Sequence, residues 1–204
     1  MNLSEQTQKL MTDIIYALPT DLWQTRLVPD HDHLGERVLS TEYTRGQLIN
    51  SVRFLRNVNR EGRHVYGRPA TNRHILVDDL DQDALDQMKL DGLEHAVAVQ
   101  TSKANYQAWV TVSDTEISRE TASAAAKILA QRYEGDPCSA GYSHLGRLPG
   151  FTNRKEIHWS ETGYPFTRFR GKPKRLVAPR SLELLVDAER LPSSPDFTLP
   201  LPST

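Results

Sequence analysis

A short apolar run that ends in carboxylates is the part of this sequence with the clearest chemical potential. Ile75, Leu76 and Val77 are followed directly by Asp78 and Asp79. Carboxylates this close repel one another and need a counter-charge, which a hard cation such as Mg²⁺ or Mn²⁺ supplies. Two such ions would support an in-line phosphoryl displacement. In a regular strand the two acids point to opposite faces, so the strand must twist or end between them.

The alternative interpretation of the same run is structural. Asp81 would cap the following helix, and Asp78 and Asp79 would form a solvated turn. Asp81 is favoured as a cap over a metal ligand, and the spacing alone leaves the role of the other two acids open.

A second polar set follows on the strand predicted over 105–113. Asn105 and Gln107 alternate onto one face with Trp109, and Ser102 lies in the preceding turn. Amides and hydroxyls beside a carboxylate site would hold a base, sugar or phosphate. A polar outer face of an antiparallel sheet would give the same pattern.

A loop rich in glycine and basic residues occupies residues 135–155 and brings a third carboxylate, Asp136, after a helix. Arg147, Arg154 and Lys155 cluster in an otherwise neutral chain, and guanidinium groups bind phosphate bidentately. Structural arginines paired with nearby acids are the competing interpretation. A second basic segment contains Arg168, Arg170, Lys172, Lys174 and Arg175. With Phe166 and Phe169 interleaved it suits single-stranded nucleic acid, or else a solvated loop.

Composition narrows the class of protein. The 204 residues carry 25 Lys and Arg against 26 Asp and Glu, a net charge of −1, which excludes a generic polycation that coats nucleic acid. The single cysteine, Cys138, excludes an internal disulfide and a cysteine-based zinc site. There is no apolar run of the ~20 residues that a membrane span needs. The polar N-terminus does not resemble a signal peptide, so we expect a cytoplasmic protein without membrane partners.

The elements that must position these residues follow from hydrophobic spacing. We expect helices over 4–18, from about Thr41 to Gly62, 81–91, 115–133 and 181–190, and strands over 64–68, 74–79, 95–101 and 105–113. Residues 28–36 are predicted to form an exposed loop, and the Pro- and Ser-rich tail a linker. The order predicts an α+β fold, a mostly antiparallel sheet with flanking helices.

Four motifs in order carry a family resemblance. They are R-x-V-Y-G-R-P at 63–69, H-I-L-V-D-D-L-D at 74–81, V-Q-T-S-x-x-N-Y-Q-A-W-V at 99–110, and G-D-P-x-S-A followed by H-L-G-R-L-P-G-F-T-N-R-K at 135–155. Together they resemble the RepB-type plasmid DNA primases of the archaeo-eukaryotic primase superfamily. The resemblance implies an RRM-like catalytic core that makes short primers on single-stranded DNA by nucleotidyl transfer, initiating plasmid or mobile-element replication.

The resemblance also implies roles for particular residues. Asp78, Asp79 and Asp136 would be catalytic and hold two Mg²⁺ or Mn²⁺ ions. The superfamily's second motif ends in histidine, and this chain has no histidine there, so the side chain that touches the nucleotide stays open. The implied nucleotide-binding residues are Ser102, Asn105, Gln107, His144, Arg147, Asn153 and Lys155, with Arg68 a weaker candidate. Arg168, Arg170, Lys172, Lys174 and Arg175 would hold DNA.

The expected organisation has an N-terminal helix and loop (1–40) packed on a catalytic domain (41–178), followed by a short helix and tail (179–204). Expected partners are single-stranded DNA template and nucleoside triphosphates, with a replication helicase or initiator proteins as further candidates. Two rivals stay open. His31-Asp32-His33 offers the histidine pair of an HUH-type nicking enzyme, although loop signals surround it. A catalytically silent RRM-like binding module, with structural acids, is the other.

Overall fold

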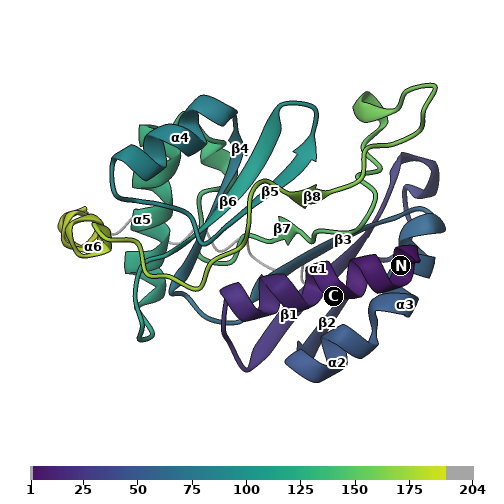
Figure 1. The fold of residues 1–204 in the computed structure, drawn as a ribbon, viewed down its shortest axis with the longest axis horizontal. Coiled ribbons are helices and arrows are strands. Elements are labelled where there is room, and N and C mark those ends of the chain that lie inside the picture. Colours follow the sequence, from purple (N-terminus) through teal and green to yellow (C-terminus); the bar gives the residue numbers. More distant parts are fainter. Residues whose placement is uncertain (1, 192–204) are drawn as a thin grey trace, which may run out of the picture.

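The computed structural model describes residues 2–191, and its framework is a pair of four-stranded antiparallel sheets. The first sheet has the order β2-β1-β3-β7. Its strands are β1 (Leu22–Pro29), β2 (Leu39–Thr44), β3 (Arg63–Pro69) and the short β7 (Gly146–Arg147). Figure 1 shows this sheet beside the second one, with the N-terminal helix lying across it.

The second sheet has the order β4-β6-β5-β8. Its strands are β4 (His74–Leu80), β5 (Val97–Ser102), β6 (Asn105–Thr111) and the short β8 (Arg168–Phe169). Continuous runs of buried residues build this sheet: residues 74–77 of β4, residues 97–99 of β5 and every residue of β6 after Asn105 are buried. The α+β prediction of antiparallel pairing with flanking helices is confirmed, with the pairing divided between two sheets.

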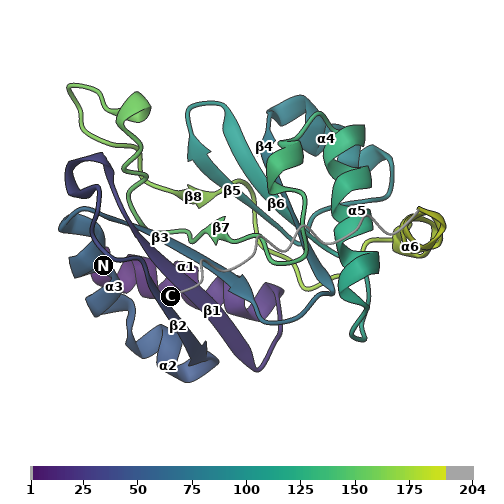
Figure 2. The same cartoon turned by 180° about the vertical axis from the view of Figure 1, so that it is seen from behind.

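Three helices cover one face of the first sheet: α1 (Leu3–Ala17), α2 (Arg45–Asn50) and α3 (Val52–Arg60). Asn2 closes a capping box with Glu5 at the start of α1. Met11 and Ile14 of α1 then pack in one buried cluster with Trp23 and Leu27 of β1. The neighbouring side chains of β1 must point to the other face of the sheet, which stays free of these helices and is visible in Figure 2.

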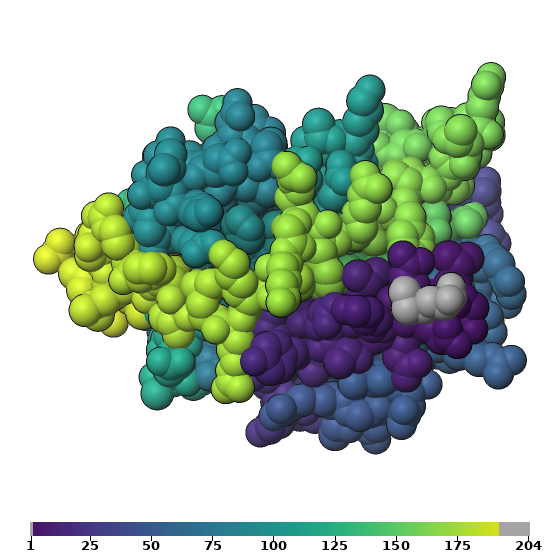
Figure 3. Space-filling view, in the orientation of Figure 1, coloured from purple at the N-terminus to yellow at the C-terminus, as the bar shows by residue number. Residues whose placement is uncertain are grey.

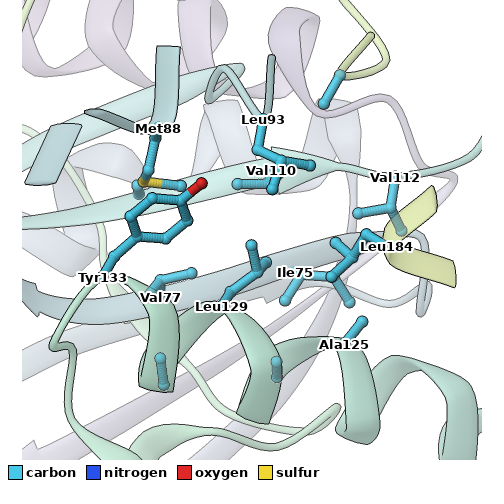
Figure 4. Packing of buried hydrophobic residues seen from close by; sticks show 14 of the residues in the cluster. Ile75, Val77, Met88, Leu93, Val110, Val112, Ala125, Leu129, Tyr133 and Leu184 are labelled. Atoms are coloured by element: carbon cyan, nitrogen blue, oxygen red, sulfur yellow. The ribbon is translucent and has the colours of Figure 1, made fainter. Parts of the chain in front are cut away.

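The second sheet packs on α5 (Arg119–Arg132), with α4 (Gln82–Leu90) and α6 (Ser181–Arg190) completing its core. Ala125 and Leu129 on α5 face Ile75 and Val77 on β4, and Leu184 of α6 closes one end (Figure 4). Small alanines on α5 let the helix lie close to the sheet. This core fixes the end of β4, where the two adjacent acids lie.

The N-terminal third differs most from expectation. The helix predicted from about Thr41 to Gly62 has the wrong start and is divided into α2 and α3. Residues 39–44 instead form β2, whose residues are all exposed except the half-buried Tyr43. The helix begins only at Arg45, where Thr44 and Gln47 form a capping box. Residues 28–36 are not simply an exposed loop, since β1 runs to Pro29, Asp30 is buried, and a 3-10 helix, η1, spans His31–His33.

The other predicted helices and strands are present within a few residues, and α6 spans 181–190 as expected. The linker predicted for the C-terminal tail falls almost wholly outside the described residues. In the part of the chain that the structure describes, no helix has the length and apolar character to cross a bilayer.

Candidate active site

A cavity of about 780 Å³ opens between the two sheets, and the three predicted acids all line it. Asp78 and Asp79 come from the end of β4, whereas Asp136 follows α5. His144 and Lys155 line the same cavity. The opposite wall comes from the helix-free face of the first sheet, with polar residues Gln24, Arg26, Ser40 and Glu42.

The end of β4 is irregular where the two acids lie. The pairing register with β6 shifts between Val77 and Leu80, and Asp79 has a positive φ of 59°. The strand therefore breaks its alternation at these residues, as the sequence required if both acids were to share one cavity. The backbone N–H of Asp79 donates to Asp78 Oδ1 at 3.0 Å, and Asn105 Nδ2 donates to Asp79 Oδ1 at 2.9 Å.

Asp136 reaches the pair through the backbone. Its N–H donates to the carbonyl oxygen of Asp78 at 3.0 Å. The preceding residue is Gly135, where a Cβ would lie 2.8 Å from that same carbonyl oxygen. The carboxylate of Asp136 also caps a 3-10 helix, η2 (Pro137–Ser139), accepting from the backbone N–H of Cys138 at 2.9 Å and from Ser139 Oγ at 2.5 Å.

Burial and like charge act on these carboxylates. Burial raises the pKa of Asp78; the hydrogen bond from the backbone N–H of Asp79 opposes the rise, and the charge of the Asp79 carboxylate adds to it. The hydrogen bond from Ser139 is the main cause that lowers the pKa of Asp136. Burial lowers the pKa of His144, while Asp78 and Asp136 favour its charged form. The cavity thus holds a carboxylate whose charge is poorly solvated, and an added cation would stabilise it.

The donor chemistry of the acids fits Mg²⁺ or Mn²⁺, since carboxylate oxygens are hard ligands. The carboxylate oxygens of Asp78, Asp79 and Asp136 do not all lie within 4.8 Å of one another. Over residues 2–191, the group that brings three ligand atoms within 4.8 Å of one another is Asp30, His31 and Asp32. The carboxylate oxygens of Asp30 are already engaged, one with His33 Nδ1 at 2.7 Å and one with Arg154 Nε at 2.5 Å.

Arg147 is 6% exposed and does not itself line the cavity, although Tyr66 beside it does. Its guanidinium lies 4.8 Å from the centre of the Tyr66 ring, and Nη1 lies 3.0 Å from His64 Nδ1. Its Nη2 is buried and has no partner among the described residues. Burial, reinforced by the positive charge of Arg147, lowers the pKa of His64 to about 4, so the imidazole is neutral and accepts from the guanidinium.

Other predicted nucleotide-binding residues have structural partners. Gln107 is 1% exposed, and both ends of its amide bond the backbone of Arg147. Asn153 is also 1% exposed and donates to the carbonyl oxygen of Thr101 at 2.8 Å. Ser102 is buried at the end of β5. Gln107, Asn153 and Ser102 do not line the cavity, whereas His144 and Lys155 do.

Neither Arg68 nor the predicted DNA-binding residues line the cavity that holds the acids. Arg68 is buried, donates to the carbonyl oxygen of Thr71 and lies 5.9 Å from the centre of the Tyr142 ring. Figure 3 shows the segment after β8 running beside α1. Several of its cations bond to neighbouring side chains: Arg168 to Gln100, Arg170 to Gln82 and Lys174 to Glu94.

Sequence reasoning missed Asp30. Its side chain is wholly buried and ties Arg154 to the end of β1. Arg154 lies beside Lys155, so this ion pair anchors the cavity loop to the first sheet. A Pro-Asp dipeptide among loop residues gave no sign of burial. The preference for Asp81 as a cap is confirmed, because its side chain accepts from the N–H of Ala84 at 2.8 Å at the start of α4.

Comparison with known proteins gives a consistent family. Residues 44–184 match the model of the RepB DNA-primase N-terminal domain. The chain is 43% identical over 131 residues to "Mobilization protein A" of Escherichia coli, a match that covers 63% of this chain and 18% of that protein. It is 33% identical over 153 residues to "DNA primase" of Acidithiobacillus ferrooxidans, covering 72% and 43%. The matches therefore span less than half the length of either relative.

Solved structures agree with these sequence matches. The crystal structure of primase RepB′ superposes with a TM-score of 0.83 at 32% identity, covering 90% of this chain and 62% of that one. The catalytic domain of RepB′ in complex with initiator DNA gives 0.81 at 32% identity, covering 90% and 94%. The primase-polymerase domain of cyanophage S-2L gives 0.64 at 10% identity, covering 87% and 97%, which shows a shared fold.

Proposed function

The chain belongs to the RepB DNA-primase family, and on that premise we propose that it makes short primers on single-stranded DNA by metal-dependent nucleotidyl transfer. The observation that carries the proposal is the convergence of Asp78, Asp79 and Asp136 on one cavity. The neighbouring structure solved with initiator DNA supports DNA as a partner. Nucleoside triphosphates would be the second substrate.

The acids would hold two Mg²⁺ or Mn²⁺ ions. The chemistry that such ions supply when bound is a lower pKa for an attacking hydroxyl and neutralisation of charge at the reacting phosphate. Asp78 is held in place by the bond from the N–H of Asp136, and Asp79 by Asn105. These bonds fix the backbone of Asp78 and the carboxylate of Asp79, so the end of β4 holds both acids at the cavity.

The basic residues would orient the triphosphate. Lys155 lines the cavity, and Arg147 lies close enough to Asp78 for their charges to interact. Asn153 accepts from the backbone N–H of Lys155 at 3.2 Å, so its role is to position that lysine. The neutral imidazole of His64 accepts a hydrogen bond from Arg147 and leaves the positive charge of the guanidinium unpaired.

The wider biology is proposed on the same basis. The enzyme would act in the cytoplasm at the start of plasmid or mobile-element replication, beside a replication helicase or initiator proteins. Residues 41–178 would form the catalytic domain together with β1 from residues 1–40, which lies between β2 and β3, and 179–204 would follow. The basic residues Arg168–Arg175 would contact DNA outside the cavity. The nicking-enzyme alternative gains no support, because His31 and His33 lie in a 3-10 helix, and His33 bonds Asp30.

The test is primer synthesis by a variant that carries Asp78→Asn and Asp79→Asn. With a single-stranded template and labelled nucleotides, we expect synthesis to fall by about 10²-fold or more, because the groups that stabilise developing charge are lost. The melting temperature should hold or rise, since a poorly solvated carboxylate and its repulsion are removed.

The matched control is Asp83→Asn with Asp86→Asn, which removes two exposed carboxylates from α4 and should leave synthesis unchanged. Calorimetric titration with Mn²⁺ adds an independent readout: heat of binding should appear with the native chain and disappear with the Asp78/Asp79 variant. Undiminished synthesis by that folded variant would refute the metal role. Absence of Mn²⁺ binding by the native chain would instead favour a non-catalytic binding module.

A further inference from the structure

Two large apolar side chains project from the loop that follows the cavity. Ile157 is 85% exposed and Trp159 is 61% exposed. The sequence contains three tryptophans, and the other two, Trp23 and Trp109, are 0% and 2% exposed. Exposed apolar side chains that lie together on a protein surface often mark an interaction site.

The loop that carries Ile157 and Trp159 is held by several specific contacts. A β-bridge between Thr152 and Phe166 closes its base. Arg154 forms an ion pair with Asp30, and its guanidinium carbon lies 5.2 Å from the centre of the Tyr164 ring. At the tip, a 3-10 helix, η3 (Glu156–His158), is followed by a bond from the N–H of Trp159 to the carbonyl oxygen of Glu156 at 2.9 Å. The outward direction of the two side chains is thus set by the fold.

The loop lies beside the cavity. Lys155 immediately precedes η3 and lines the cavity with the acids. His158, between the two apolar residues, is close enough to Lys155, Arg147 and Asp79 for their charges to affect it. The cation Lys155 therefore lies at the start of the tip, and the loop's own exposed acids, Glu156 and Glu161, oppose its charge.

We propose that Trp159 and Ile157 form a platform on which bases of the single-stranded DNA stack as the strand passes the cavity. Single-strand binding combines aromatic faces for bases with cations for phosphates, and this loop places an exposed indole next to Lys155. The basic Lys155 at the start of the tip favours a strand that carries phosphates over an uncharged protein surface. The inference rests on the proposed primase function and adds a base-stacking site distinct from the acids.

The number and burial of the tryptophans make a direct optical test. A short oligothymidylate is added to the full chain without metal or nucleotide, and tryptophan emission is recorded. We expect quenching, because stacking on Trp159 brings a base against the one indole that solvent reaches among the described tryptophans. The Trp159→Phe variant should bind the same DNA with no such quenching, since its remaining indoles are buried.

Anisotropy of the labelled oligonucleotide measures affinity separately. Trp159→Ala should weaken binding by about tenfold, whereas Trp159→Phe keeps an aromatic face and should lose much less. The matched control is Tyr16→Ala, which removes an aromatic ring that is 66% exposed on α1 and should leave affinity unchanged. Circular dichroism confirms that each variant is folded.

Failure of this inference and failure of the proposed function are distinguishable. The Asp78→Asn/Asp79→Asn variant should show full quenching without primer synthesis, because the platform and the acids are separate groups. Normal DNA affinity in Trp159→Ala, or binding by the native chain without quenching, would overturn the platform and leave the primase proposal standing. An emission shift that depends on protein concentration without DNA would assign the loop to self-association and overturn it as well.

Discussion

Gln107 shows how a side chain in a predicted binding pattern can hold the site together from outside the cavity. Its Nε2 donates to the carbonyl oxygen of Arg147 at 2.7 Å, and its Oε1 accepts from the N–H of Arg147 at 2.9 Å. Gln107 belongs to β6 of the second sheet and Arg147 to β7 of the first. The side-chain amide of Gln107 therefore joins the two sheets at Arg147.

Replacing Gln107 with leucine should destabilise the protein by about 2 to 4 kcal/mol, because two buried backbone groups of Arg147 would lose their partners. Urea denaturation measures the change. The comparison variant is Gln100→Leu on β5, whose amide bonds the exposed Arg168 and should cost no more than about 0.5 kcal/mol. Equal stability of the two variants would show that the sheets are joined by other contacts.

At the scale of elements, the site depends on how the end of α5 meets the end of β4. Gly135 lies at this junction, and a Cβ there would lie 2.8 Å from the carbonyl oxygen of Asp78. That oxygen accepts from the N–H of Asp136. A residue without a side chain is therefore what lets the third acid approach the first two.

Gly135→Ala should push Asp136 away from Asp78, lowering primer synthesis by about tenfold and destabilising the fold by about 1 to 3 kcal/mol. The matched control is Gly46→Ala in α2, outside the cavity lining, where a Cβ meets nothing within 4 Å. Synthesis rates and melting temperatures of both variants check the prediction. A fully active Gly135→Ala enzyme would mean that the acids tolerate a wider spacing.

The elements also show what the sequence alone could predict. The apolar run ending at Asp78 and Asp79 indicated β4, its acids and the need for a break, and the bulge supplies that break. Helical spacing predicted α1 and α6 well. Strand β2 was missed because an exposed edge strand carries no alternating apolar signal. β7 and β8 span two residues each, too few for any periodicity.

The site was predicted less completely than the fold. Residue types indicated the acids, His144 and Lys155, which share the cavity. Residue types could not show that the side-chain amides of Gln107 and Asn153 donate to backbone carbonyl oxygens, because these partners are far away in sequence. Nor could they show that Asp30 anchors Arg154. Such roles follow from tertiary packing.

Across the whole molecule, two buried histidines should make stability depend on pH. Burial lowers the pKa of His64 and of His74 to about 4. In the unfolded chain a histidine takes up a proton below about pH 6.5. Between these values unfolding binds protons, so stability is greatest above pH 6.5 and falls as the pH drops toward 4.

The expected loss is up to about 1.4 kcal/mol per pH unit for each histidine in that window. Urea denaturation at a series of pH values measures it. His74→Gln, distant from the cavity acids, should flatten the slope by removing one of the two groups. An unchanged slope in this variant would assign the acid sensitivity to other groups.

The order of the chain has a consequence for when the active site comes into being. The three long strands of the first sheet lie within residues 22–69, and those of the second within 74–111. Only later do β7 and β8 return, one to each sheet, on either side of the loop that carries Lys155 and after Asp136. A polypeptide emerging from the ribosome can pair both frameworks from nearby segments first, and the long-range closures come last. The cavity that holds the three acids can therefore form only after the long strands of both sheets have been synthesised.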